Sequence, residues 1–413
     1  MSTIVLAWEL GAGYGHLGRL LPVAAALVRR GHRPIFIVRD LFRAQTVLGG
    51  RGFTILQAPV WLGPTPDDLD RVPSYAGTLL QQGYHRSVAL AGLLSAWRRL
   101  LAWLQPDLVL IDHAPTAALA ARSLGLTAAL IGVGYGSPPR TTPLPAFDSR
   151  LGATAERLLA AEANILQVIN ATLEPLGAAP LGRLAELLDM AEDFLCSFAE
   201  LDHFGPRADR HYWGPLETSF GTGRPAWPAG EGPRVFAFLD AGYAGFSALA
   251  AALRRLGLAT LAYARDLPSA RAAELGSASL QFTDQPVDLA WALGQCDLAV
   301  SAASHGATVA ALLAGRPLLL LPHQGEQAMI ARRVVALGAG LAIDVAAEPK
   351  ADFAAAIRRL IDEPAFAEQA RRFAADHADF DAAAAAEAVA ARCEELARDK
   401  PPPIHLSYRF TLS

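Results

Sequence analysis

The stretch 301–327 constrains the fold of this chain more than any other, because strand and helix signals alternate within it. It begins with small residues, continues as an apolar segment that Gly315-Arg316-Pro317 ends, and resumes as the leucine run 318–321. Such a run is typical of a strand that is covered on both faces. A strand end, a helix and a buried strand in this order predict a parallel α/β arrangement.

The turn before this helix is suited to a phosphate group. Its small residues allow a close approach to a ligand, and a helix that begins near Gly306 aims free N–H groups and the positive end of its dipole at that ligand. Beyond Pro322, a loop offers Glu326 and Gln327, an acceptor and an amide that suit sugar hydroxyls. The candidate ligands at the helix are Ser304, His305, Gly306 and Thr308.

A second candidate site lies near the N-terminus. Residues 4–8 predict an apolar strand, which a glycine-rich turn and a helix over 17–30 follow, as in the first unit of a doubly wound sheet. The turn places His16 at the carboxyl end of the strand, where open α/β sheets bind ligands. The glycine-rich turn alone does not decide the function, because a dehydrogenase would want an acid after the second strand and Asp40 lies close to that place.

The buried strand 106–112 ends in Asp112, a carboxylate that is costly to bury unless it has a partner. The residues themselves leave two interpretations of this pair open. His16 either acts on a ligand or only hydrogen-bonds its own loop, and Asp112 either has a functional partner or caps the helix after Pro115. We expect His113 to point to the opposite side if the strand continues that far.

Both regions resemble the GT-B glycosyltransferases related to UDP-glycosyltransferases. In that superfamily the order is His-Gly-Gly-x-Gly-Thr, a helix, Gly-x-Pro, an apolar strand and Pro-x-x-x-Asp-Gln, and residues 302–327 follow it with Glu326-Gln327 as the final pair. The N-terminal similarity rests on the Gly-x-Gly-His form that ends at His16, on Leu20-Leu21-Pro22 and on Arg30-Gly31-His32. The resemblance covers residues 4 to about 397 and implies an α/β, GT-B protein with two Rossmann-like, doubly wound domains facing a cleft.

This resemblance, together with the run of prolines and glycines after residue 211, predicts four segments. The helices after residue 350 are expected to complete the second domain. The segments are an N-terminal acceptor-binding Rossmann-like domain (1–211), an interdomain linker (212–233), a C-terminal nucleotide-sugar-binding Rossmann-like domain (234–398) and a C-terminal tail (399–413).

The activity that the resemblance implies is inverting, metal-independent transfer of a sugar, of the hexosyltransferase type. The donor is a nucleoside-diphosphate sugar, expected to be a UDP-sugar, and the acceptor is the hydroxyl of an unknown small molecule or lipid. His16 is implied as the base and Asp112 as the residue that holds it and stabilises its protonated form. Beyond this co-substrate we expect no cofactor and no metal. The further residues that the resemblance implies are Gln285 and Val287 at the nucleobase, and Gly13, Tyr14 and Tyr135 on the acceptor side, with loops 58–82 and 132–147.

Two departures from the superfamily pattern keep other functions open. Ala302 stands where the phosphate-binding His is expected, and Asp240 lies in a turn where it would repel a donor phosphate unless it is turned away. A GT-B enzyme of other chemistry, such as a nucleotide-sugar hydrolase or epimerase, is one alternative. The other is a non-catalytic descendant that binds a nucleotide or a protein partner.

The net charge and the cysteines limit the kinds of partner and the cellular compartment that we expect. With 36 basic and 40 acidic residues the net charge is −4, which argues against a nucleic-acid partner. The three scattered cysteines are typical of a reducing compartment. Glu9 interrupts the first apolar run, so we expect no signal peptide, no transmembrane segment and a cytoplasmic location. The tryptophan-bearing helix 87–104 is expected to pack in the core, with contact to a membrane surface as the alternative.

Overall fold

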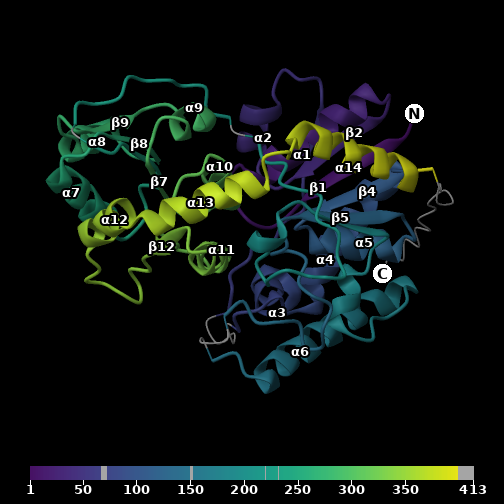
Figure 1. The fold of residues 1–413 in the computed structure, drawn as a ribbon. Coiled ribbons are helices and arrows are strands. Elements are labelled where there is room, and N and C mark those ends of the chain that lie inside the picture. The colour runs from purple at the N-terminus through teal and green to yellow at the C-terminus, as the bar shows by residue number, and fades with distance from the viewer. Residues whose placement is uncertain (67–71, 149–151, 219, 231, 399–413) are drawn as a thin grey trace. The chain divides into compact units, whose positions relative to one another are not determined.

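The computed structural model describes residues 1–66, 72–148, 152–218, 220–230 and 232–398, so the predicted tail 399–413 lies outside the described residues. The chain divides into two compact units (Figure 1). The first unit contains Met1–Phe198, Arg207–Leu216 and the helix that begins at Ala382. The second contains Ala199–Pro206 and Glu217–Asp381.

A six-stranded parallel sheet with the order β3-β2-β1-β4-β5-β6 forms the centre of the first unit. Its inner strands β1 and β4 are almost wholly buried, as their apolar runs predict, whereas the edge strand β3 is partly exposed. The strands are β1 Thr3–Trp8, β2 Arg33–Val38, β3 Thr54–Gln57, β4 Leu108–Asp112, β5 Ala128–Gly132 and β6 Glu192–Leu195.

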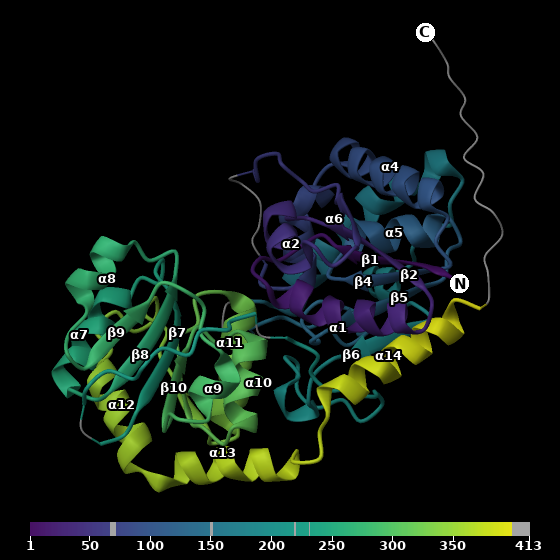
Figure 2. The same ribbon diagram turned by 90° about the horizontal axis from the view of Figure 1, so that it is seen from above.

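Helices cover both faces of this sheet, with α1 and α14 on one side and α4 and α5 on the other (Figure 2). The α-helices of this unit are α1 Gly15–Arg29, α2 Leu41–Leu48, α3 Tyr75–Leu79, α4 Ser87–Leu104, α5 Pro115–Ser123, α6 Ala155–Leu173 and α14 Ala382–Leu396.

The strand order reverses between β1 and β4, which makes their carboxyl ends the expected place for a ligand site. Trp8 and Asp112, the last residues of these two strands, are partners in the parallel register. The loop that leads to His16 and the loop that leads to α5 therefore leave the sheet from neighbouring points.

Helix α14 lies with the first unit, although we predicted that the helices after residue 350 complete the second domain. It packs along α1, and its buried face consists of small and apolar side chains (Figure 2). Ion pairs join Arg30 to Glu394 at 2.6 Å and Arg392 to Glu192 at 2.9 Å. The predicted linker is divided as well, because the chain passes from the first unit to the second between Leu216 and Glu217.

The second unit has a parallel sheet of the same topology, with the order β12-β11-β10-β7-β8-β9. Its strands are β7 Val235–Asp240, β8 Thr260–Arg265, β9 Leu280–Thr283, β10 Leu298–Ser301, β11 Leu318–Leu320 and β12 Gly340–Ala342. Its helices are α7 Phe246–Leu256, α8 Ser269–Leu275, α9 Leu289–Leu293, α10 His305–Leu313, α11 Gly325–Ala336, α12 Phe353–Asp362 and α13 Pro364–Asp376.

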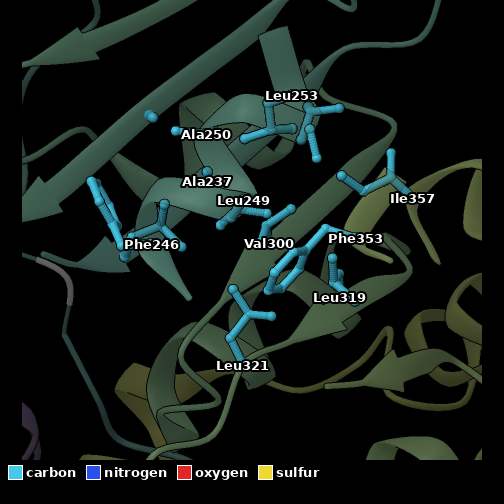
Figure 3. Close-up of a cluster of buried hydrophobic side chains, with 14 of the residues drawn as sticks. Ala237, Phe246, Leu249, Ala250, Leu253, Val300, Leu319, Leu321, Phe353 and Ile357 are labelled. Carbon is cyan, nitrogen blue, oxygen red and sulfur yellow. The ribbon is translucent and has the colours of Figure 1, made fainter. Parts of the chain in front are cut away.

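The core of the second unit lies between this sheet, α7 and α12 (Figure 3). Leu249 and Leu253 of α7 meet Val300 of β10 and Ile357 of α12, all at most 1% exposed. The carboxyl ends of β7 and β10 adjoin at the reversal of strand order, so the turn before α10 occupies the place that the sequence predicts for a ligand.

The structure bears on two functions that the sequence left open, a ribose-binding role for Asp40 and a membrane contact for α4. Asp40 caps α2, accepting a hydrogen bond from the Arg43 backbone and pairing with its guanidinium, so this acid has a structural role. In α4, Trp97 is fully buried, whereas Trp103 is 71% exposed. Across the described residues, no helix is long and apolar enough to cross a membrane.

Candidate active site

His16, Asp112 and Arg19 form a buried polar cluster at the carboxyl ends of β1 and β4. His16 lies in the first turn of α1, and its Nδ1 is 2.8 Å from Oδ1 of Asp112. Arg19, one helical turn further on, donates to Oδ2 of Asp112 at 2.7 Å. The two carboxylate oxygens of Asp112 are therefore held by two different side chains. Asp112 itself is only 1% exposed. The structure brings together both predicted catalytic residues and adds Arg19.

The protonation state of Asp112 determines which nitrogen of His16 is free. Burial alone would raise the pKa of Asp112, but the charge of Arg19 and the hydrogen bond from His16 outweigh it and hold that pKa below its ordinary value. A carboxylate can only accept hydrogen bonds, so Nδ1 of His16 must donate. The neutral imidazole then carries its lone pair on Nε2, as a general base requires.

The His16 ring is also held by its packing. Trp8 stacks on it with ring centroids 5.0 Å apart, and Gly11 has a φ of +87°. A Cβ on Gly11 would lie only 2.5 Å from Nε2 of His16, so both the backbone and the ring require glycine.

A Gly11→Ala substitution is therefore expected to displace the His16 imidazole. Gly31→Ala is the matched control, because Gly31 has a φ of +81° but open space around its Cβ position. Each should lose about 1 kcal/mol from backbone strain, as measured by thermal unfolding. Only Gly11→Ala should shift the NMR resonances of the His16 ring; equal shifts in both variants would contradict this packing.

His113 does not continue the strand, so our expectation that it points to the opposite face does not apply. The strand ends at Asp112, and His113 has a φ of +47°. Its ring lies 6.3 Å from that of His16 and 5.8 Å from that of Tyr135, measured between centroids. Burial lowers the pKa of His113 to about 3, so it stays neutral beside the candidate base. Tyr135, predicted on the acceptor side, thus packs against His113, which in turn neighbours His16.

Glu9 follows β1 and is buried against the N-terminus of α5. Its Oε2 accepts a hydrogen bond from the backbone N–H of Thr116 at 2.8 Å. Burial nevertheless dominates and raises the pKa of Glu9 from 4.5 to about 7. The folded protein thus favours the protonated carboxyl, although the helix N-terminus favours its charge.

This shift predicts a pH-dependent stability. Because the pKa is raised on folding, the contribution of Glu9 is complete below pH 4.5 and is lost as the pH rises through about 7. The corresponding loss is about 3 kcal/mol by pH 9. Glu9→Gln, whose amide oxygen can still accept from Thr116, should lack this part of the decline in urea unfolding at pH 5, 7 and 9. Identical declines in both proteins would refute it.

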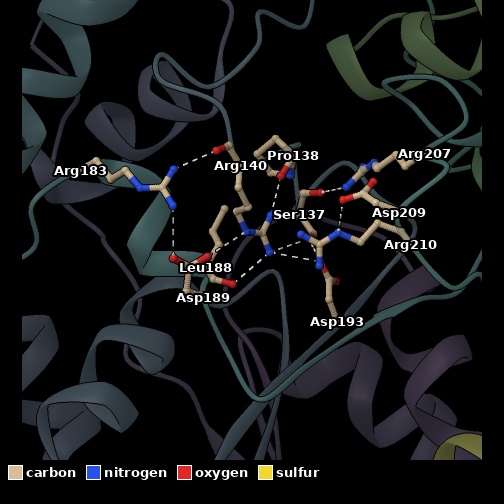
Figure 4. A network of polar contacts seen from close by, with 10 residues as sticks. All are labelled: Ser137, Pro138, Arg140, Arg183, Leu188, Asp189, Asp193, Arg207, Asp209 and Arg210. Atoms are coloured by element: carbon tan, nitrogen blue, oxygen red, sulfur yellow. Dashed lines mark hydrogen bonds and ion pairs between the residues drawn. The ribbon is translucent and has the colours of Figure 1, made fainter.

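The predicted acceptor-side loop 132–147 is fastened by a network around Arg140 (Figure 4). Arg140 contacts Asp193 of β6 at 3.1 Å and the carbonyl of Leu188 at 2.9 Å. Arg207 donates to the carbonyl of Ser137 at 2.7 Å. Of the other residues predicted on the acceptor side, Gly13 has a φ of +84° and Tyr14 is the N-cap of α1.

In the second unit, α10 begins at His305, one residue before the predicted start. Its N-cap Ser304 is exposed, and Gly306 is half-buried. Thr308 is fully buried, and its hydroxyl has no hydrogen-bond partner within the described part of the chain. Ala302, the departure from the superfamily pattern, directly follows β10 and is half-buried.

His305 does not extend outward as the predicted phosphate ligand would. It is 5% exposed, and its Nδ1 lies 3.1 Å from Oε1 of Glu217. The reason is the carboxylate of Glu217, which a proline-rich segment brings against the first turn of α10. Ser304, the N-cap, is the exposed polar side chain at the start of this helix.

Glu326 and Gln327 lie in the first turn of α11 and not in a loop, because that helix begins at Gly325. Gln327 accepts a hydrogen bond from the backbone of His323 at 3.0 Å. The Glu326 side chain is 40% exposed, and its Oε1 lies 3.7 Å from Nε2 of His203.

The predicted nucleobase segment, which contains Gln285 and Val287, pairs with the segment that we predicted as the interdomain linker (212–233). Val287 is 2% exposed and forms a parallel bridge with Gly223, so its side chain is buried. Gln285 is exposed. Asp240 pairs with Arg265 and accepts a hydrogen bond from the Gly242 N–H at 2.9 Å. These partners outweigh burial and lower the pKa of Asp240.

Within the described residues, no group of three or more His, Cys, Asp or Glu side chains could hold a metal ion. The sequence contains two Asp-x-Asp triplets, of the type that chelates a metal with a diphosphate. Asp379–Phe380–Asp381 precedes α14, and Asp68–Leu69–Asp70 lies outside the described residues.

Comparison with known proteins supports the architecture. Residues 283–396 match the family described as erythromycin biosynthesis protein CIII-like, C-terminal domain. No curated protein sequence matches the chain. Several solved structures share the fold over nearly the full length of both chains.

Three of them, all glycosyltransferases, illustrate the similarity. CalG4, the calicheamicin glycosyltransferase, has a TM-score of 0.71 at 21% identity over 97% of this chain and 99% of its own. The glycotransferase of kitacinnamycin has a TM-score of 0.70 at 20% identity, with coverages of 96% and 98%. The spinosyn rhamnosyltransferase SpnG has a TM-score of 0.65 at 20% identity, with coverages of 95% and 99%.

At these identities the structural likeness establishes the fold, which is GT-B. This fold and the match of residues 283–396 to that family agree with the sequence resemblance to the GT-B glycosyltransferases.

Proposed function

We propose that this protein is an inverting glycosyltransferase that moves a sugar from a pyrimidine nucleoside diphosphate to an acceptor hydroxyl without a metal ion. The observation that carries the proposal is the cluster of His16, Asp112 and Arg19. Its hydrogen bonds leave Nε2 of His16 as the basic nitrogen, in a side chain that is 16% exposed and therefore accessible.

In the proposed reaction, Nε2 of His16 takes the proton of the acceptor hydroxyl as its oxygen attacks the anomeric carbon. A carbon–oxygen bond forms on one face of the sugar, and the bond to the diphosphate oxygen breaks on the other. The configuration at the anomeric carbon is inverted. Asp112 stabilises the imidazolium that results, and Arg19 keeps Asp112 ionised throughout.

The second unit supplies the groups for the donor. The N-terminus of α10, with Ser304 and Gly306, is suited to the leaving diphosphate, because its free N–H groups and dipole favour negative charge. Glu326 and Gln327 are proposed to bind sugar hydroxyls, and Gln285 and the backbone of Val287 the base. SpnG has been solved with thymidine diphosphate and with spinosyn aglycone, so thymidine and uridine diphosphates are the first donors to test.

The experiment is to incubate the full chain with UDP-glucose, dTDP-glucose and dTDP-rhamnose, with and without a panel of phenolic and aliphatic alcohols. We expect one nucleotide sugar to raise the melting temperature, because a ligand that binds only the folded protein stabilises it. With an acceptor, mass spectrometry should detect the glycoside and NMR its inverted anomeric configuration. Turnover should persist in EDTA.

Other outcomes would support the alternatives. Consumption of donor at the same rate without acceptor indicates a nucleotide-sugar hydrolase or epimerase. Binding without turnover under any condition indicates a non-catalytic descendant, for which Ala302 in place of the superfamily histidine is the first structural reason.

A further inference from the structure

We propose that His203 is a positioning residue that orients Glu326 toward the donor sugar; this inference rests on the proposed function. His203 belongs to the short segment Ala199–Pro206, which the chain inserts into the second unit between two stretches of the first. Nothing in the sequence pattern marked it, because no strand or glycine-rich turn adjoins it.

Four side chains, which we call the imidazole cluster, connect the N-terminus of α10 to that of α11. Glu217 lies 3.1 Å from His305, measured from Oε1 to Nδ1. The rings of His305 and His203 stack with centroids 6.3 Å apart and an interplanar angle of 20°. Nε2 of His203 lies 3.7 Å from Oε1 of Glu326. The cluster thus has a carboxylate at each end and two imidazole rings between them.

Three members of the cluster are buried, and only the fourth, Glu326 at the proposed sugar site, is exposed. The His203 side chain is 0% exposed, that of His305 4% and that of Glu217 9%, whereas the Glu326 side chain is 40% exposed. Glu326 is therefore the only member of the cluster that projects well into solvent. Left alone, such a side chain samples several rotamers, and fixing it on binding costs free energy.

The segment that carries His203 is itself fixed to the second unit. The carbonyl of Glu200 accepts a hydrogen bond from Arg333 of α11 at 2.9 Å, and its carboxylate lies 3.4 Å from His377. His203 is consequently a rigid partner for one oxygen of Glu326. Since a carboxylate has two acceptor oxygens, Oε2 can face a sugar hydroxyl while Oε1 faces His203.

This arrangement predicts different effects on two kinds of ligand, because Glu326 is proposed to contact the sugar and not the nucleotide. His203→Leu should weaken the binding of UDP-glucose or dTDP-glucose by about 3- to 10-fold, as expected for a lost orienting contact. Binding of UDP or dTDP should change less than 2-fold. His203→Gln, which keeps a donor directed at Glu326, should recover most of the loss.

Isothermal titration calorimetry on the full chain tests this with the same ligands and three further variants. Glu326→Gln sets the size of the sugar contact, and the double variant His203→Leu/Glu326→Gln should bind no more weakly than Glu326→Gln alone, since the two residues act through one contact. His377→Leu is the matched control; it loosens the Ala199–Pro206 segment without touching Glu326.

The possible results are distinct. Equal weakening of nucleotide and nucleotide sugar, additive losses in the double variant, or the same effect from His377→Leu would each overturn the role of His203. If the native protein binds neither UDP, dTDP nor their glucose derivatives, the proposed function fails, and the inference fails with it.

Discussion

A His16→Ala variant is expected to transfer sugar about 10²- to 10⁴-fold more slowly than the native protein, the usual contribution of a general base. The loss should appear in kcat, because the imidazole acts as the acceptor oxygen attacks and is not needed to bind the donor. UDP or dTDP should bind with unchanged affinity in calorimetry. The measurement is the initial rate of glycoside formation at saturating donor.

His32→Ala is the matched control for this substitution. His32 follows the other end of α1 and also faces a carboxylate, with Nε2 3.7 Å from Glu394. An effect on protein stability alone would be shared by the two variants, whereas the loss of turnover should belong to His16→Ala. Full turnover in His16→Ala would remove this residue from the proposed mechanism.

An Arg19→Leu variant is expected to have the largest effect on stability, about 3–5 kcal/mol at pH 7, because it leaves the buried charge of Asp112 without its arginine. Arg19 helps to hold the pKa of Asp112 low, and a lowered pKa contributes stability above the unfolded pKa that is lost as the pH falls through the folded one. Without Arg19 the protein should therefore gain relative stability on acidification. Urea unfolding at pH 5 and pH 8 measures the difference.

The double variant Arg19→Leu/Asp112→Asn separates charge from packing. Replacing the carboxylate by a neutral amide removes the uncompensated charge, so part of the lost stability should return and the difference between pH 5 and pH 8 should shrink. If the double variant is less stable than Arg19→Leu at pH 8, Asp112 does not carry a buried charge there. Both variants should also be inactive, since each disturbs the carboxylate that orients His16.

The sequence predicts the sheets well because the buried strands are continuous apolar runs, such as the leucines that form β11. It also predicts His16 and Asp112, since both lie where a central strand ends. Arg19 could have been found, because it is three residues after His16 and such residues share a helix face. The catalytic roles of these residues stay predictions until they are tested.

The second site is harder to predict, because its side chains are paired by residues from distant segments. Glu217 and His203 lie outside any strand–helix unit, yet they decide that His305 is buried and that Glu326 has a neighbour. The local pattern predicts α14 as a helix from its alanines, but it contains no signal for the partner α1. Tertiary pairing of this kind is not encoded in hydrophobic periodicity.

The position of α14 has a consequence for recombining such enzymes. The first unit is discontinuous in sequence, so a chimera cut once in the linker would join the N-terminal sheet of one parent to the final helix of the other. Arg30 and Arg392 would then face foreign carboxylates, and the apolar stripe of α14 would meet a foreign α1. An exchange of the whole first unit has to move residues 382–396 together with the N-terminal half.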